Sequence, residues 1–163
     1  MEEGIAQMRQ GMPVWQATGT EVDRLYYLVL LADIYGKAGQ AEEGLHGLAE
    51  ALTVVDAIEE RYYEAELYRF QGELLLVRAT GHDTEAETYF RQALDIAHYQ
   101  QAKSLELHAA MSLARLWQRQ GQRAAARDLL APIYGWFTEG FDTADLQEAR
   151  ALLPIRYGPV PDR

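Results

Sequence analysis

A repeat of about forty residues runs through the chain and constrains its fold more than any other feature. Two sets of small and bulky residues both recur with this spacing. A single unit of this length cannot bury its own apolar side, so successive units must stack on one another. One set is Gly4, Ile5, Met8 and Gly11, then Gly44, Leu45, Leu48 and Ala51, then Ala86, Phe90 and Ala93, then Ala126 and Leu130. The other set is Leu31, Ala32 and Tyr35, then Gln71, Gly72 and Leu75, then Leu113, Ala114 and Trp117.

Each unit is predicted to be two helices joined by a turn. The order of large and small residues matches the packing faces of the two helices of a tetratricopeptide repeat. Small residues allow two helices to approach closely, and bulky ones fill the space between successive hairpins. The sequence therefore predicts an all-α fold: a right-handed α-solenoid of tetratricopeptide-like helical hairpins with a C-terminal capping helix.

Helical periodicity predicts eight helices and no strand. Gly39, Gly81 and Gly121 follow three of these helices, where glycine supplies the left-handed conformation that ends a helix. Thr84 followed by Glu87 predicts a capping box at the start of another. The expected helices are 2–16, 21–38, 41–57, 61–79, 84–99, 103–120, 123–137 and 143–153.

These elements predict one helical-repeat domain over 1–153 and an extended tail over 154–163, beginning at Pro154. The domain divides into a half repeat 1–18, repeats 19–58, 59–100 and 101–140, and a cap helix 142–153. The first residues match the pattern of the second helix of a repeat, and no preceding first helix is there to bury their apolar side. We therefore expect either further sequence before residue 1 or a second copy packed on Ile5, Met8 and Met12.

The composition excludes several classes of protein. The chain has no cysteine, so it contains neither a disulfide nor a thiolate metal site. Its 25 acidic and 15 basic residues give a net charge of −10, which repels nucleic acid and anionic lipid. No apolar run is long enough to span a bilayer. We expect a cytoplasmic protein that binds neither nucleic acid nor membrane.

Several stretches carry a more specific similarity. They are residues 63–67 (YEAEL), 72–76 (GELLL), 86–97 (AETYFRQALDIA), 104–107 (SLEL), 112–117 (SLARLW) and 131–143 (APIYGWFTEGFDT). Together they resemble the C-terminal tetratricopeptide-repeat region of large bacterial proteins that join a class III adenylate or guanylate cyclase domain to a P-loop signalling ATPase. The resemblance covers residues 60–149. It implies that this chain lies at the C-terminal end of such a protein, after both enzyme domains.

No residue pattern in this chain indicates catalysis. Gly36 and Lys37 are followed by Ala38, so the phosphate-binding loop of an ATPase is absent. The histidines include no pair three or four residues apart, and neither Ser104 nor Ser112 lies in a nucleophile elbow. We expect no catalytic residue, no cofactor and no metal site.

Aromatic residues are predicted mainly to fill the core. Trp136 and Phe137 either pack beneath the last helix, which we favour, or are presented to a partner. The residues expected in the core are the doublets Tyr26 and Tyr27, and Tyr62 and Tyr63, together with Trp117.

The repeat phase also predicts which residues line the concave face. Acidic residues concentrate toward one end of this face and basic residues toward the other, an order that could orient a partner of mixed charge. The alternative is that these charges pair with one another, with Arg69 on Asp33 or Glu73 and Arg115 on Glu73. The expected inward residues are Tyr26, Val29, Asp33, Lys37, Glu66, Arg69, Glu73, Val77, His108, Met111, Arg115 and Arg119.

The expected function is a non-catalytic protein-interaction module that regulates its parent signalling protein. Its partner would be a protein or peptide, with the ATPase domain of the same parent chain as one candidate. Two alternatives remain open. One is a homodimerisation scaffold, using the N-terminal helix or the Trp136 and Phe137 region. The other is a small-molecule sensor, or an enzyme not evident from motifs, in which Tyr26, Arg69 and Arg115 face a pocket.

Overall fold

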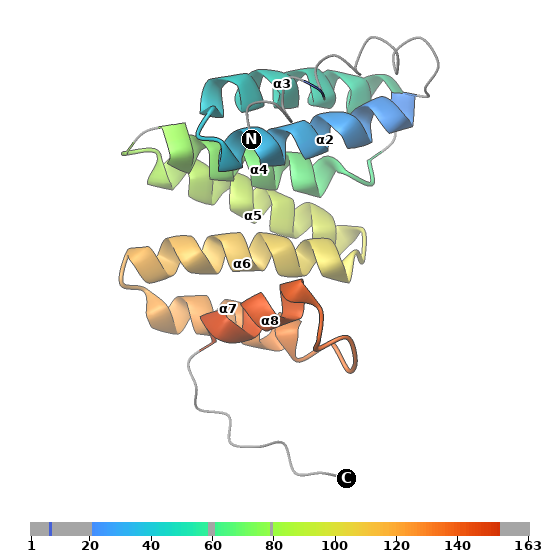
Figure 1. The fold of residues 1–163 in the computed structure, drawn as a ribbon. Helices are drawn as coiled ribbons and strands as arrows, with labels where there is room; N and C mark the ends of the chain where they lie inside the picture. The colour runs from blue at the N-terminus through green and yellow to red at the C-terminus, as the bar shows by residue number, and fades with distance from the viewer. Residues whose placement is uncertain (1–6, 8–20, 59–60, 79, 154–163) are drawn as a thin grey trace.

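The computed structural model describes residues 7, 21–58, 61–78 and 80–153, and within them it contains seven α-helices and no strand (Figure 1). The all-α prediction is thus confirmed for the described residues. The helices are α2 (Glu21–Lys37), α3 (Ala41–Ile58), α4 (Glu64–Arg78), α5 (Asp83–Tyr99), α6 (Lys103–Arg119), α7 (Arg123–Tyr134) and α8 (Ala144–Leu152). Apart from residue 7, the expected helix 2–16 and its half repeat lie outside the described residues, as does the tail 154–163.

The expected helix boundaries agree with the structure to within about one turn. The largest differences are at α4, which begins at Glu64, and at α7, which ends at Tyr134 where the sequence predicted 137. Gly135 follows α7 directly and disfavours further helix because of its backbone freedom. The chain then turns before α8, so Trp136 and Phe137 lie in a loop.

The helices pack as an open stack in two layers. Consecutive helices contact each other, and α2, α4, α6 and α8 also contact one another in succession as one layer (Figure 1). Helices α3, α5 and α7 form the other layer and contact only their neighbours in sequence. Among the described helices, α2 and α3 make no contact with α6, α7 or α8. The stack therefore does not close into a bundle, and the face of the α2, α4, α6 and α8 layer stays open.

The small and bulky positions of the repeat form the core. Gly72 of α4 packs directly on the ring of Phe90 of α5, which is fully buried. A Cβ atom added to Gly72 would lie 2.5 Å from Phe90 Cε1, so the two helices approach this closely only because residue 72 lacks a side chain. Other buried repeat positions are Leu31, Ala32, Tyr35, Gly44, Leu48, Ala51, Ala86, Ala93, Leu113, Ala114, Trp117, Ala126 and Leu130.

Three glycines end helices as the sequence predicts. Gly39, Gly81 and Gly121 have φ angles of 73°, 97° and 81°, in the left-handed region that favours glycine. Gly39 and Gly121 come just after α2 and α6, and Gly81 lies between α4 and α5. These turns all join a helix of the first layer to one of the second.

The predicted capping box of Thr84 and Glu87 is wrong. Helix α5 begins at Asp83, its N-cap is His82, and no side chain caps it. The Glu87 carboxylate instead accepts hydrogen bonds from Arg91 and, at 3.1 Å, from the indole N–H of the buried Trp117. A buried indole N–H needs an acceptor, and Glu87 supplies it across the α5–α6 contact.

Two glycine substitutions separate helix propensity from packing. Gly72→Ala should lower the free energy of unfolding by about 1–3 kcal/mol because its methyl group overlaps Phe90. Gly47→Ala on α3 meets nothing within 4 Å, so it should raise the same quantity by about 0.5–1 kcal/mol through helix propensity. Urea unfolding followed by circular dichroism measures both. Equal effects of the two substitutions would contradict the close approach of α4 and α5.

Candidate functional site

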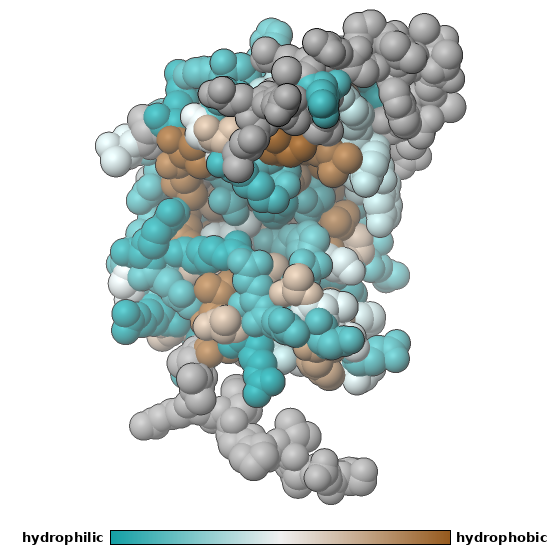
Figure 2. Space-filling model, viewed as in Figure 1, coloured by the Kyte–Doolittle hydropathy of each residue, from teal (hydrophilic) through white to brown (hydrophobic). Residues whose placement is uncertain are grey.

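One face of the stack is hollowed by a groove of about 460 Å³. Side chains from α2, α4, α6 and α8 line it, so it runs across the open layer. Figure 2 shows the molecule from the side of Figure 1 as mostly hydrophilic, with separate hydrophobic patches. The lining residues are Ala32, Asp33, Gly36, Lys37, Arg69, Phe70, Glu73, Leu74, Val77, His108, Met111, Arg115, Asp145 and Glu148.

The repeat phase places most of the expected inward residues in this groove. Eight of the twelve line it: Asp33, Lys37, Arg69, Glu73, Val77, His108, Met111 and Arg115. Glu66 contacts two of them from beneath. The other three do not line it: Tyr26 is about half exposed, Val29 of α2 is buried in the core, and Arg119 is exposed at the end of α6. The structure thus brings eight of the expected residues together in the groove and leaves Tyr26, Val29 and Arg119 outside it.

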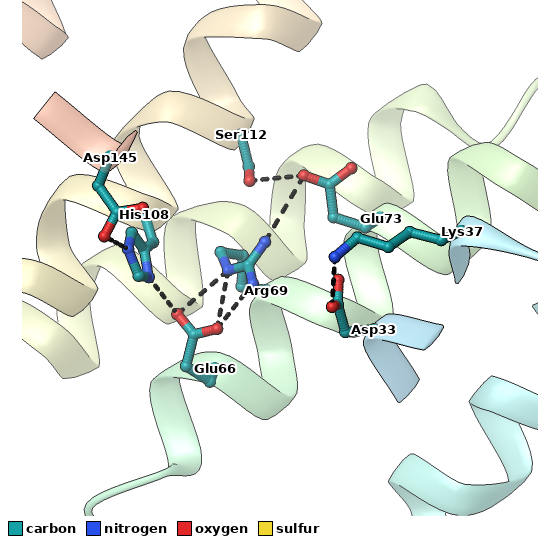
Figure 3. A network of polar contacts seen from close by, with 8 residues as sticks. All are labelled: Asp33, Lys37, Glu66, Arg69, Glu73, His108, Ser112 and Asp145. Atoms are coloured by element: carbon teal, nitrogen blue, oxygen red, sulfur yellow. Dashed lines mark hydrogen bonds and ion pairs between the residues drawn. The ribbon is translucent and has the colours of Figure 1, made fainter. Parts of the chain in front are cut away.

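Glu66 and Arg69 form the centre of a polar network in the groove (Figure 3). Both come from α4, one helical turn apart, so their side chains meet on the same face. Arg69 Nε lies 3.1 Å from both Glu66 carboxylate oxygens, and Arg69 Nη2 lies 2.7 Å from Oε2. Both side chains are largely buried, with exposed fractions of 15% for Arg69 and 11% for Glu66. This pair is a buried, charge-assisted contact in which several hydrogen bonds offset desolvation.

His108 of α6 connects this pair to the last helix. Its Nδ1 lies 3.1 Å from Glu66 Oε1, and its Nε2 lies 3.0 Å from Asp145 Oδ2 of α8. One imidazole thus contacts carboxylates on two different helices. When both ring nitrogens carry protons, His108 donates to both carboxylates at once.

The environment shifts two pKa values in this network. Burial alone would raise the pKa of Glu66, but hydrogen bonds from His108 and Arg69 and their positive charges outweigh burial and lower that pKa to about 2. The hydrogen bond to Glu66 is the main cause that raises the pKa of His108. Burial and the charge of Arg69 oppose this rise, and Asp145 adds to it. Glu66 is therefore ionised at neutral pH, and protonated His108 is favoured.

Helix α8 contributes two further acidic residues to the groove. Glu148 Oε1 lies 2.6 Å from Arg115 Nη2, and Asp145 contacts His108 as described. The sequence predicted this helix only as a cap on the stack, and Leu146 and Ala149 are indeed buried. A signal was present, because Asp145 and Glu148 are spaced i, i+3, as are Glu66 with Arg69 and His108 with Met111 on the preceding helices.

Glu73 and Asp33 are partly exposed carboxylates of the groove, at 36% and 34%. Ser112 Oγ donates a hydrogen bond of 2.6 Å to Glu73 Oε1, and Arg69 Nη1 lies 3.8 Å from the same oxygen. Lys37 Nζ lies 2.6 Å from Asp33 Oδ2 in an exposed pair on α2. Ser112 was not predicted to take part, since it is buried at a packing position of α6.

The alternative of internal pairing holds, with partly different partners. Arg69 is bound chiefly to Glu66 and lies 3.8 Å from Glu73, while Arg115 is bound to Glu148 rather than to Glu73. The predicted basic end of the groove is thereby corrected, because α8 brings a carboxylate to Arg115 there. The charge order expected along the groove does not survive this neutralisation.

The aromatic predictions hold only in part. Trp117 is buried in the core, and Phe137 packs against the same cluster. Trp136 is 59% exposed and stands edge-on to Phe137, with ring centroids 5.2 Å apart, so the prediction that it packs beneath the last helix is wrong. Tyr26 and Tyr62 are also exposed rather than core residues, at 48% and 57%.

Within the described residues, no group of three or more histidine, cysteine, aspartate or glutamate side chains could hold a metal ion. In the same part of the chain, no helix combines the length and apolar character needed to cross a membrane. Comparison with known protein families and with curated proteins finds no match to this chain. The geometry of the groove and the sequence pattern therefore carry the functional argument.

Two of the acidic residues bound to groove cations, Glu66 and Asp33, should differ sharply in their effect on stability. Glu66→Gln leaves the Arg69 guanidinium buried without its main partner and should lower the free energy of unfolding by about 3 kcal/mol. Asp33→Asn removes an exposed pair on α2 and should change it by less than about 0.5 kcal/mol. Urea titration of both variants tests this, and comparable losses would contradict the buried network.

His108 should make stability depend on pH. Its pKa is raised in the folded protein, so its contribution is fully present below about 6.5, the unfolded value, and is lost as the pH rises through the folded pKa. Between about pH 6 and about pH 9, wild-type protein should therefore lose more of its free energy of unfolding than His108→Gln does. Chemical unfolding at several pH values measures the difference, with His46→Gln on the exposed side of α3 as the control. Parallel curves for wild type and His108→Gln would refute the contacts to Glu66 and Asp145.

Proposed function

We propose that this chain is a tetratricopeptide-like helical-repeat solenoid, right-handed, that acts as a non-catalytic protein-interaction module. The groove across α2, α4, α6 and α8 is its partner-binding surface. The repeat spacing, the two-layer stack and the burial of the small positions support the solenoid assignment. Stacked helical hairpins leave an extended face on which a peptide or protein segment can lie.

The observation that carries this proposal is the composition of the groove. Four successive helices of one layer contribute to it, and each places side chains there at helical spacing. Apolar residues, including Leu74 and Val77, alternate with charged ones, a combination typical of surfaces that fix a peptide by side-chain pockets and polar contacts.

The resemblance of residues 60–149 favours a place at the C-terminal end of a bacterial cyclase and ATPase signalling protein, in the cytoplasm. In that setting the module would bind a protein or peptide, among which the ATPase domain of the same chain is a candidate. Binding there would regulate the parent by favouring one of its conformations. The assignment to this kind of parent protein rests on the sequence similarity alone.

A second candidate is self-association through the α7–α8 loop. Trp136 and Phe141 are 59% and 46% exposed there, and exposed aromatic side chains are frequent in interfaces. The small-molecule alternative has less support. The guanidinium groups of Arg69 and Arg115 on which it depended are committed to Glu66 and Glu148.

Site-specific photocrosslinking tests the groove directly. A benzophenone amino acid at Val77, which is 46% exposed in the groove, should form adducts with partner proteins in a lysate of the source cells. The same amino acid at Thr53, exposed on α3 in the other layer, should not, because Thr53 does not line the groove. Mass spectrometry of the adducts identifies both partner and contact site.

Three controls make the outcome decisive. Excess unlabelled protein should abolish the adducts at position 77. Equal adducts at positions 77 and 53, or none at either, would count against a partner-binding groove. Dimer-mass adducts from a benzophenone at Trp136 would instead favour the self-association candidate.

A further inference from the structure

The cations of the groove are already engaged by acidic side chains of the chain itself. Arg69 is bound by Glu66, Arg115 by Glu148, and Lys37 by Asp33. An acidic ligand would have to displace these carboxylates, one of which, Glu148, comes from a helix that is packed into the core through Leu146 and Ala149. The groove is thus poorly suited to an acidic partner.

Negative charge is in excess in the groove. Its carboxylates are Asp33, Glu66, Glu73, Asp145 and Glu148, and its permanent cations are only Lys37, Arg69 and Arg115. His108 with a proton reduces this excess without removing it. The chain as a whole carries a net charge of −10, so the long-range field acts in the same direction. The excess of negative charge in the groove and the net charge of the chain both favour the approach of a positively charged segment.

Among the groove carboxylates of the described residues, Glu73 is the one without a basic nitrogen within hydrogen-bond distance. Its Oε1 accepts the hydrogen bond from Ser112, and the nearest cationic nitrogen, Arg69 Nη1, is 3.8 Å away and directed mainly to Glu66. The second oxygen, Oε2, has no partner among the described residues, and it carries no contact line in Figure 3. The side chain is 36% exposed. An incoming cation can therefore reach it without breaking a buried pair.

The surroundings of Glu73 suit the stem of a long basic side chain. Val77 lies one turn further along α4 and is 46% exposed, and Leu74 and Met111 line the same hollow. Lysine and arginine place their methylene groups on apolar surface while the charged head stays at a polar site. Figure 3 shows Arg69 beside Glu73 and Lys37 bound to Asp33, and the exposed pair of Lys37 and Asp33 on α2 is weak.

We propose that the groove binds a basic segment of a partner protein, with a lysine or arginine head group on Glu73 Oε2 and its stem against Val77. This inference rests on the proposed interaction function and names the chemistry of the partner.

The experiment selects ligands without assuming their sequence. A phage library of random dodecapeptides is panned against the full chain, and the selected peptides are synthesised with a fluorescent label. They should be enriched in lysine and arginine next to apolar residues, and they should crosslink to a benzophenone at position 77. Fluorescence anisotropy should show weaker binding at higher salt concentration, since the contact is partly exposed.

Matched variants then test Glu73 itself. Glu73→Gln keeps the acceptor for Ser112 but loses the charge, and it should weaken binding about tenfold, the effect of one charge-assisted hydrogen bond. Glu43→Gln removes one charge from the exposed side of α3 and should leave binding unchanged. Thermal unfolding of both variants checks that they remain folded.

The alternative outcomes separate this inference from the proposed function. Peptides that crosslink at position 77 but lack basic residues, or that bind Glu73→Gln as tightly as wild type, overturn the basic partner and leave the groove function intact. Selected peptides that do not crosslink at position 77, or a library that yields no binder, overturn both.

Discussion

The close contact between helices at small residues is the constraint on which the rest of the structure depends. Gly72 lets α4 lie directly on the ring of Phe90, and alanines at equivalent positions do the same for neighbouring helices. Small buried residues recur along the chain, and each helix contacts its neighbours in sequence. The helices therefore add in one direction, and one layer keeps an open face. The groove is a consequence of how the core packs.

Within that groove the strongest polar contacts are internal. Burying Glu66 and Arg69 side by side carries a large desolvation cost, which their hydrogen bonds and His108 offset. His108 and Arg115 in turn attach α8 to the layer through Asp145 and Glu148. The network thus helps to hold the last helix against α6, in addition to the burial of Leu146 and Ala149. The charges of this network therefore stabilise the fold itself, independently of any partner.

The sequence predicted what depends on periodicity and missed what depends on local geometry. Helix positions, the left-handed glycines and the centre of the groove follow from a repeated phase, so Arg69 and Glu73 could be placed without coordinates. The capping box at Thr84 failed because moving the helix start by one residue changes which side chain can cap it. The exposure of Trp136 was missed because no period governs a loop. The partners of the groove cations were not predicted, because the sequence pattern of α8 indicated its apolar side and not the contacts of Asp145 and Glu148.

Internal pairing also explains how such a groove can be selective. A ligand that competes for Arg69 or Arg115 must first separate a carboxylate from it, and the loss of that contact offsets much of what the ligand gains. A cation at Glu73 faces less competition, because the guanidinium of Arg69 is directed mainly to Glu66 and lies 3.8 Å from the Glu73 oxygen that Ser112 occupies. The paired residues thus disfavour acidic ligands, and Glu73 favours basic ones. Discrimination arises here from repulsion and prior occupancy as much as from attraction.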